Sequence, residues 1–460
     1  MSTALGQFID HDITAQTDRP SMVSDIRKPA VIPQDPDHIV CNLKNLRRAF
    51  LELDSVYGDG RSFDPSCPTQ AEARGMFDGA KMQIGQNTVN SDIPGALIPP
   101  EDDLRRDLPR NSADRSPIIG DGRNDENLIV AQLHTAFLRF HNAIVDVLAS
   151  GGAGLSDEGL FNEASRLVRW HYQWIVLNEY LPTIAKSSVI HDIRKNGRRF
   201  FKPKVGIFMP LEFSVAAFRF GHSMVRGSYD FNRNFGVGVE AEPVVEDADF
   251  QQIFHFTGRG GFDPSGQGGS DGGLVTLPFN WIIEWDRFVA VNGNLRRSAR
   301  KIDTRLAADL GNMQNQIRGI PADTPATIRD LLVHLAMRNL LRGYSLSIPT
   351  GQALAQAMGI TPLTAAELKQ DNSTELNCIL DESGFIERTP AWYYILKESE
   401  VRECGNSLGD VGSRIVGETL IGLIEEDPDS FMNATNHWKP EDGVGVMTIE
   451  ELFRFSEVLP

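Results

Sequence analysis

The first residues that could do chemistry lie in the segment GQFIDHDIT, residues 6–14. Read as a helix, this segment places Gln7 and His11 at positions i and i+4, so an amide and an imidazole project from one face. Asp10 and Asp12 flank the histidine and point about 200° apart at roughly 100° per residue, so they cannot serve the same partner. The alternative interpretation is a solvated helix start, in which the aspartates offset the helix dipole.

The ten histidines of the chain raise the question of a metal site. His134 and His141 are seven residues apart on one predicted helix, roughly 10 Å along its axis, which is too far to share an ion. We expect them to be core or surface residues. The sequence contains no H-E-x-x-H, E-x-x-H or H-x-H pattern, which argues against zinc-hydrolase and di-iron sites. Haem iron remains, because the porphyrin supplies four ligands and one axial imidazole suffices.

His222 is the candidate for such a single ligand. It stands in the segment FRFGH, beside Phe218, Phe220 and Gly221, on a predicted apolar helix. Aromatic side chains and a glycine would allow a flat macrocycle to approach closely. A lone histidine on an apolar helix is more often a hydrogen-bonded core residue, so spacing alone leaves both interpretations open.

The elements that must position these residues are predicted to be mainly α-helical. Apolar residues recur at helical spacing in several segments, whereas strand signals are few and no internal repeat is present. Residues 17–37 and 58–125 are predicted to be long loops, which usually carry function or wrap a ligand. The glycine-rich span 258–273 is predicted to be a flexible surface loop. The predicted helices cover residues 126–148, 162–185, 211–225, 326–343 (closed by Gly343 as a C-cap) and 412–431.

Composition limits the classes of partner. The 460-residue chain has a net charge of −17, which argues against a nucleic-acid or anionic-membrane surface, since phosphate binding needs clustered cations. No run approaches the ~18 apolar residues of a membrane span. No secretory signal is visible, so the protein stays inside the cell or the sequence begins downstream of its natural start. Free thiols and up to two disulfides fit the cysteines equally well: Cys41, Cys67, Cys378 and Cys404.

Seven segments together resemble the animal-type haem peroxidases, the superfamily of myeloperoxidase, lactoperoxidase, peroxidasin and their bacterial relatives. In chain order they are GQFIDHD, VYG, GDGRNDE, LHTAFLRFHN, NEYLP, AFRFGH and RNLLRG, and they span nearly the whole chain. The resemblance implies one large helical peroxidase domain of the bacterial type over residues 1–460, with haem b as cofactor. It also implies that hydrogen peroxide is reduced, through an oxoferryl intermediate, at the expense of small donors such as phenols or halides. A part in the response to oxidative stress would follow.

The resemblance assigns a role to each matching residue on the distal side. His11 matches the distal histidine, which takes a proton from hydrogen peroxide and returns it to the leaving oxygen. Gln7 would line the same pocket and hold a water or a small anionic substrate. Arg123 matches the distal arginine, whose fixed charge stabilises the anionic hydroperoxide.

On the haem itself, His222 matches the proximal iron ligand. The resemblance also implies that Asn339 accepts the other imidazole N–H and so fixes its tautomer. Two arginines would lie near the haem propionates, and two carboxylates could form ester bonds to haem methyl groups. These residues are Arg219 and Arg342 for the propionates, and Asp10 and Glu126 for the esters.

Calcium is a further cofactor that the resemblance implies. Its ligands would be the Asp12 carboxylate, the Phe50 carbonyl, Glu52 and Asp54. Their oxygens could serve a hard cation, but Arg48 stands where the family places a neutral ligand.

Other departures from the family concern haem attachment and the N-terminal cover. Asn127 stands where myeloperoxidase has the methionine of its sulfonium link, so that third haem bond is absent here. Leu5 stands where a tryptophan is common, and the N-terminal stretch that covers this region in the family is short or missing.

Two other functions are alternatives to the peroxidase. A fatty-acid dioxygenase of the cyclooxygenase-related type needs a radical-forming tyrosine three residues before the proximal histidine, where this chain has Arg219. A non-catalytic haem-binding or adhesion module would be expected to show a degraded site, but the residues that the chemistry needs are present.

Overall fold

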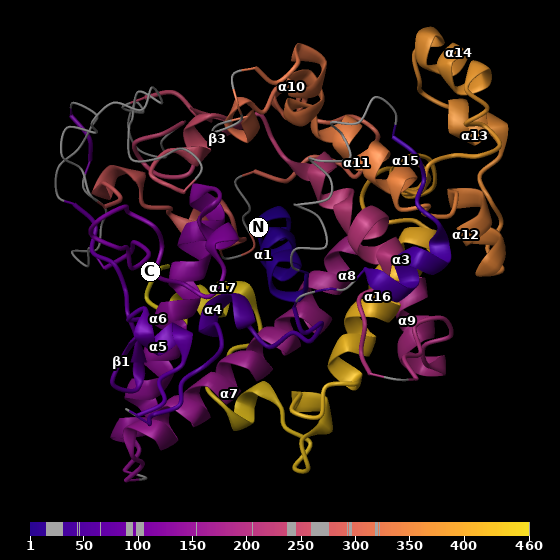
Figure 1. Cartoon of the computed structure of the whole chain (residues 1–460). Helices are drawn as coiled ribbons and strands as arrows, with labels where there is room; N and C mark the ends of the chain where they lie inside the picture. Colours follow the sequence, from indigo (N-terminus) through magenta and orange to yellow (C-terminus); the bar gives the residue numbers. More distant parts are fainter. Residues whose placement is uncertain are drawn as a thin grey trace.

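The fold is mainly α-helical, as predicted, and Figure 1 shows helices packed around a central N-terminal helix. Strands occur within the described residues only as two short antiparallel pairs, β1 (Phe77–Asp78) with β2 (Lys81–Met82) and β3 (Ser228–Tyr229) with β4 (Ala248–Asp249). The structure is a computed structural model and describes residues 1–14, 31–43, 45, 47–64, 66–88, 95–97, 105–152, 154–204, 206–236, 245–258, 276–291, 293, 297–317, 321 and 323–459. The predicted glycine-rich loop and most of the predicted loop 17–37 lie outside these residues.

The helical elements are of two kinds. The α-helices are α1 (Ser2–Ile13), α3 (Pro36–Asn42), α4 (Asp54–Tyr57), α5 (Gln70–Ala73), α6 (Leu128–Ser150), α7 (Asp157–Ile175), α8 (Leu181–Ile184), α9 (Ser187–Asn196), α10 (Ala326–Val333), α11 (Leu335–Ser345), α12 (Gly351–Ala357), α13 (Ala365–Lys369), α14 (Thr374–Glu382), α15 (Ala391–Arg402), α16 (Asp410–Glu425) and α17 (Ile449–Phe455). The 3₁₀ and π segments are η1 (Gly122–Asp125), η2 (Val176–Tyr180), η3 (Glu212–Ala216), η4 (Ala217–Met224), η5 (Gln252–Phe254), η6 (Phe279–Trp281), η7 (Trp285–Arg287), η8 (Ala308–Gly311), η9 (Gln314–Ile317), η10 (Phe431–Asn433) and η11 (Pro440–Asp442).

The long helices α6 and α7 form the framework. Asn127 caps α6 by accepting from the Val130 N–H, and Ser156 caps α7 by accepting from the Gly159 N–H. Every residue of α6 from Leu128 to His141 is buried, because a helix that is apolar on most of its faces is stable only inside a core. These two helices pack against each other and support the site.

The N-terminal helix α1 lies at the centre of the molecule rather than at its edge (Figure 1). Phe8 stacks on Phe137 of α6 with ring centroids 4.8 Å apart. Gly6 allows the backbone of α1 to lie close to Tyr180, since a Cβ atom at Gly6 would lie 2.5 Å from the Tyr180 hydroxyl oxygen. The segment singled out in the sequence is therefore a buried helix, and the solvated-start interpretation is wrong.

Three predicted helices have a different form in the structure. Residues 162–185 form the greater part of α7, then the π segment η2 and α8. Residues 211–225 form π segment η3 followed by 3₁₀ segment η4, with a break at Ala216 (φ −124°, ψ −70°). Residues 326–343 form two helices, because His334 has extended backbone angles between α10 and α11. Gly343 lies inside α11, so its predicted role as a C-cap is wrong.

The four cysteines are all free and exposed: Cys41, Cys67, Cys378 and Cys404. Buried apolar side chains from Leu5 to Leu459 form one large cluster, and a smaller one surrounds Ile39. None of the helices in the described part of the chain combines the length and the apolar character needed to cross a membrane.

Glu398 links helices α15 and α16 and gives a testable pH dependence. Its carboxylate is fully buried and accepts from the Val411 N–H at 3.0 Å, in place of an N-terminal side-chain cap on α16. Burial raises the pKa of Glu398 to about 7, although the hydrogen bonds from the Val411 and Gly412 N–H groups act to lower it. Between the unfolded value of 4.5 and about 7, the unfolded state is ionised while the folded state keeps its proton, so stability falls as pH rises.

Glu398→Gln should remove that fall, because glutamine does not ionise. We expect urea unfolding at pH 5 and pH 8 to show that the wild type loses on the order of 3 kcal/mol more than the variant between the two values. Exposed Glu375 is the matched control, and Glu375→Gln should behave as the wild type. Equal pH slopes in wild type and Glu398→Gln would contradict the assignment.

Candidate active site

One cavity of about 1120 Å³ brings together residues that are far apart in the sequence. Its volume is slightly above the ~300–1,000 Å³ typical of small-molecule and cofactor sites. Its walls include every residue predicted for peroxide chemistry and haem seating: Gln7, Asp10, His11, Arg123, Glu126, Arg219, His222, Asn339 and Arg342.

Four short helical stretches supply eight of these nine residues as pairs spaced three or four apart, and α1 also carries Asp10. Residues at i and i+3 or i+4 share one face of an α-helix, and residues at i and i+3 are eclipsed in a 3₁₀ helix. Each stretch therefore turns two polar side chains toward the cavity. The pairs are Gln7 with His11 on α1, Arg123 with Glu126 on and after η1, Arg219 with His222 on η4, and Asn339 with Arg342 on α11.

His11 is held by a buried polar chain that the sequence analysis did not identify. Its Nδ1 lies 2.9 Å from Oδ1 of Asn124, and Nδ2 of Asn124 lies 2.9 Å from Nδ1 of His134. His134 is fully buried, and burial lowers its pKa to about 3, so it is neutral and accepts from the amide. Asn124 then accepts from His11 Nδ1–H, which leaves the lone pair on His11 Nε2.

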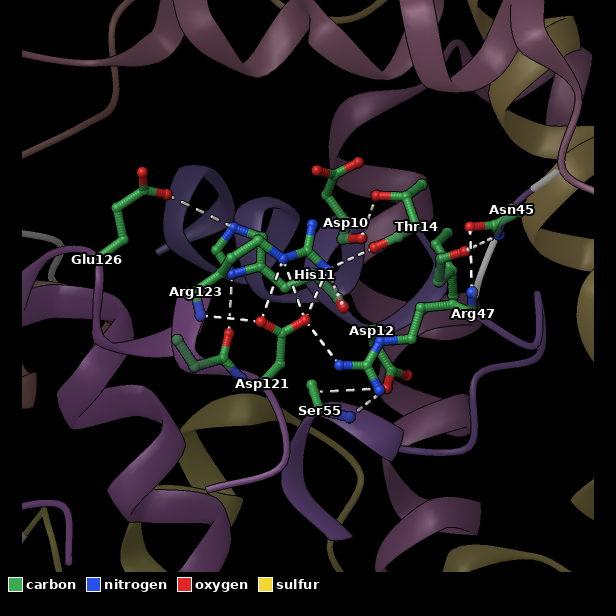
Figure 2. Close-up of polar contacts among 12 residues, drawn as sticks. Asp10, His11, Asp12, Thr14, Asn45, Arg47, Ser55, Asp121, Arg123 and Glu126 are labelled. Atoms are coloured by element: carbon green, nitrogen blue, oxygen red, sulfur yellow. Dashed lines mark hydrogen bonds and ion pairs between the residues drawn. The ribbon is translucent and has the colours of Figure 1, made fainter. Parts of the chain in front are cut away.

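Protonation of His11 is disfavoured in this setting. Burial lowers the pKa of His11 and the charge of Arg123 lowers it further, while Glu126, Asp10 and the Asn124 hydrogen bond act in the opposite direction. Its Nε2 is 3.9 Å from the Glu126 carboxylate (Figure 2). The imidazole is therefore a neutral base with its free nitrogen toward the cavity wall that Glu126 lines.

Arg123 is tied to the end of helix α1. Its Nη2 donates to the His11 carbonyl at 2.8 Å, to the Thr14 carbonyl and to Asp121 at 2.7 Å. Asp121 also accepts from Arg47 at 2.7 Å, so it lies between the two guanidinium groups (Figure 2). Burial alone would raise the pKa of Asp121, but Arg123 and Arg47 hold it well below its usual range. One arginine thus fixes the backbone of the histidine and lines the cavity as a cation.

Gln7 is oriented through Asn127, the residue that caps α6. Asn127 Nδ2 donates to Gln7 Oε1 at 3.1 Å, while its Oδ1 accepts from the Val130 N–H. The Gln7 amide nitrogen is left for a molecule in the cavity. The residue that departs from the family at the sulfonium position therefore has a positioning role in this chain.

His222 of η4 and Asn339 of α11 are in contact. Asn339 Nδ2 lies 2.9 Å from His222 Nδ1, and Asn339 Oδ1 accepts from Arg219 Nη1 at 3.2 Å. The predicted contact is formed with the amide reversed, because Arg219 takes the oxygen that was expected to accept from the imidazole. A half-turn of the amide would present Oδ1 to Nδ1–H, the form needed for an Nε2 ligand.

The surroundings of His222 fit a flat, anionic cofactor. Burial lowers the pKa of His222 to about 3, with Arg219 and Arg338 acting in the same direction, so the imidazole is neutral and able to ligate a metal. A Cβ atom at Gly221 would meet nothing within 4 Å, so the surface beside the histidine is open. Burial also lowers the pKa of Arg342 to about 10, and it stays cationic at neutral pH. One neutral imidazole with cations around it suits a haem with its two propionates.

The calcium prediction is not supported by the arrangement of its residues. Asp12 accepts from the backbone N–H groups of Leu53 at 3.1 Å and Ser55 at 3.3 Å, and Glu52 pairs with Arg48 at 3.2 Å. In the described part of the chain, no three His, Cys, Asp or Glu side chains form a group that could hold a metal ion. Backbone amides and an arginine therefore take oxygens of Asp12 and Glu52, two of the four ligands predicted for calcium, the others being Phe50 and Asp54.

Residues missed in the sequence have weak signals. Asn124 and Asp121 lie beside Arg123 in GDGRNDE, and His134 was considered only as a metal ligand or core residue. Their function depends on contacts across up to 113 positions of sequence, as between His11 and Asn124. A polar residue next to a predicted site residue was the only available hint.

Comparison with known proteins agrees with this geometry. Residues 44–263 match the family model for the animal haem peroxidase. Heme peroxidase 2 of Caenorhabditis elegans is 22% identical over 95% of this chain, which spans 60% of that relative's length. Peroxidase A from Dictyostelium discoideum has a similar fold, with a TM-score of 0.59 and 18% identity over the whole chain and 84% of its own. A fatty acid alpha-dioxygenase from Arabidopsis thaliana also has a similar fold, with a TM-score of 0.57 and 15% identity. The match covers the whole of this chain and 72% of the dioxygenase chain.

The family-model match over nearly half of the chain, the peroxidase relatives and the similar peroxidase fold together support the animal haem peroxidase superfamily for this chain.

Proposed function

We propose that this protein is a haem peroxidase that reduces hydrogen peroxide and oxidises small donors, phenols or halides. The observation that carries the proposal is the single cavity lined by His11, Arg123 and His222. Haem b, when bound, would supply a redox-active iron that peroxide oxidises and that donors return to its resting state. His222 would hold the iron, while Arg219 and Arg342 would pair with the propionates.

The chain's own residues would move the proton and hold the charge. His11 Nε2 carries the lone pair and would take the proton from the peroxide oxygen next to it, then return the proton to the departing oxygen. Arg123, anchored through Nη2, would offer the rest of its guanidinium to the negative charge that develops. Gln7 would hold a water molecule or the peroxide through its amide nitrogen.

Covalent attachment of haem is a finer part of the proposal. Asp10 and Glu126 line the cavity with their carboxylates and would form ester bonds to haem methyl groups, while Asn127 provides no sulfonium link. After turnover with peroxide, denaturing chromatography should show haem moving with the polypeptide. Double replacement by Asp10→Asn and Glu126→Gln should release it.

Peroxide-dependent oxidation of a phenolic donor by the haem-loaded protein tests the proposal. A Soret band that shifts on addition of one equivalent of peroxide, together with donor oxidation, would support it. A stable Soret band without donor oxidation would favour the non-catalytic haem-binding module. An absorption spectrum that is the same before and after the addition of peroxide would contradict the peroxidase assignment.

A fatty-acid dioxygenase is the second candidate, since the fold alone resembles a peroxidase and a dioxygenase almost equally. Arg219 argues against it, because this position three residues before His222 would have to be a tyrosine, and the arginine is tied to Ser214 and Asn339. Oxygen consumption with palmitate and no peroxide would be the distinguishing result.

Asn124 gives a prediction about positioning. Asn124→Ala removes the acceptor for His11 Nδ1–H, so both tautomers of His11 become populated and the reaction with peroxide should slow about 10–100-fold. Asn124→Asp keeps an acceptor, and neutral His134 can donate to it through its other tautomer, so this variant should retain most of the rate. The ¹⁵N spectrum of histidine-labelled protein in its diamagnetic ferrous carbon monoxide form would report the His11 tautomer directly. An unchanged tautomer in Asn124→Ala would contradict the role, whatever the activity.

A further inference from the structure

A short segment that begins in the last turn of helix α9 has the opposite sign of charge to the chain as a whole. Residues 194–204 read RKNGRRFFKPK, with six Lys or Arg and no Asp or Glu, in a chain that has 45 basic and 62 acidic residues. We call residues 194–204 and 206–208, which begin in the last turn of α9, the basic loop. The net charge, which argues against an anionic surface for the whole molecule, conceals this local cluster.

The backbone of the basic loop is firmly held against α16. Glu418, which is 1% exposed, accepts from the backbone N–H groups of Arg199 (2.9 Å), Phe200 (2.7 Å) and Phe201 (3.0 Å). Phe201 is buried, and a Cβ atom at Gly422 of α16 would lie 2.5 Å from its ring. Arg198 adds ion pairs to Glu425 and Glu426, both at 2.6 Å. The loop is therefore pre-organised, which lowers the entropy cost of binding.

This rigid loop presents two aromatic side chains to solvent. Phe200 is 46% exposed and Phe208 is 53% exposed, and the Phe208 ring lies 5.4 Å from that of Phe201. Keeping large apolar surface in water is unfavourable, so two exposed phenylalanines, one directly before Phe201 and one packed on its ring, suggest a covered state.

Exposed cations lie close to these phenylalanines in the sequence. Lys195, Lys202 and Lys204 are exposed and have no ion pair to any residue of the described part of the chain. Arg199 is also exposed, although Asp192 pairs with it at 2.8 Å. The basic loop thus combines apolar tips with unneutralised positive charge, the combination that binds at the interface of an anionic bilayer.

We propose that the basic loop docks on the surface of a bilayer containing anionic phospholipids. Phe200 and Phe208 would enter the interface, and Lys195, Lys202 and Lys204 would face the headgroup phosphates. The acidic residues that contact the loop, Glu425, Glu426 and Asp192, are paired with Arg198 and Arg199. Charges more than about 8–10 Å away are screened at physiological salt.

Nucleic acid is the other polyanion that a basic aromatic loop could bind. Single-stranded nucleic acid is usually held along a positively charged groove with stacked bases. The basic loop lines neither the active-site cavity nor the second cavity, of about 830 Å³, which lies between Asp59 and Asn436. A loop outside these hollows suits a flat surface better than a strand, so the bilayer is the favoured partner.

Co-sedimentation of the haem-loaded full chain with vesicles tests the proposal. We expect binding to vesicles of phosphatidylcholine with phosphatidylserine, weakening with added salt, and little binding to phosphatidylcholine alone. Lys202→Glu with Lys204→Glu should weaken binding on the order of tenfold, and Phe200→Ser with Phe208→Ser should do the same.

Matched controls separate the loop from general effects of charge and exposed apolar groups. Lys301→Glu with Lys439→Glu makes the same change in net charge at exposed lysines elsewhere, and Phe385→Ser removes another exposed phenylalanine, which is 40% exposed. Both should bind as the wild type, and thermal unfolding would verify that all variants fold. No binding to anionic vesicles, or equal binding by loop and control variants, would overturn the proposal. Binding of single-stranded RNA without vesicle binding would also overturn it and assign the loop to nucleic acid.

Discussion

Replacing His222 by alanine should abolish the Soret band of the haem-loaded protein. Of the two described histidines that line the cavity, His11 and His222, only His222 adjoins Gly221, and it is the neutral nitrogen donor on that wall. Titration of haem into wild type and variant, followed by absorption, is the measurement. Exposed His191 is the control, and His191→Ala should bind haem as the wild type.

Added imidazole sharpens this result. In His222→Ala the space of the lost ring opens to the cavity, so free imidazole should enter it and restore a Soret band. Restoration would show that the variant is folded and lacks only the ligand. A His222-independent Soret band would mean that another residue ligates the iron, whereas no band in either protein would remove the haem-binding assignment itself.

Replacing His11 by alanine should leave haem binding intact and slow the reaction with peroxide by about 10²–10⁴-fold. The base would be lost while His222 and the arginines remain. Stopped-flow absorption after mixing with peroxide measures the rate, and the resting spectrum verifies that haem is in place. His141 is a suitable control because it is buried on α6, bonds to Tyr57 and does not line the cavity.

His141→Ala is expected to lower stability, as loss of a buried hydrogen-bonded group does, without slowing the peroxide reaction to the same degree. A His11→Ala variant with an unchanged rate would show that another group takes the proton. An equal loss of rate in both variants would point to damage of the fold instead of loss of a base.

Much of the fold could be predicted from local patterns. The apolar spacing of residues 126–148 and 162–185 predicted α6 and α7, because in helices of four or more turns the apolar residues recur clearly at helical spacing. The same spacing could not distinguish η3 and η4 from an α-helix. Hydrogen-bond register depends on packing against neighbouring elements, and a change of register alters the spacing by only a fraction of a residue per turn.

The break at His334 was hidden for a related reason. Residues 326–343 keep an apolar periodicity through the break, yet the chain turns to extended angles at His334 and starts α11 afresh, with the His334 side chain accepting from the Met337 N–H. Gly343 then falls within the new helix. A residue's propensity is a weak signal when tertiary contacts select the helix ends.

Candidate site residues divide in the same way. The sequence alone identified side chains with the chemistry of a base, a cation and a metal ligand, and helical spacing paired Gln7 with His11. It could not show that Asn124 and His134 complete the chain behind His11, because those contacts join helices that meet only when packed.

The sequence by itself thus determined which functional groups are present and which of them share a helical face. Their shared cavity, the tautomer selected at His11 and the reversed amide of Asn339 were decided by tertiary structure. Burial is the physical reason: removing water makes each polar group depend on the few partners within hydrogen-bond reach, and those partners come from distant segments.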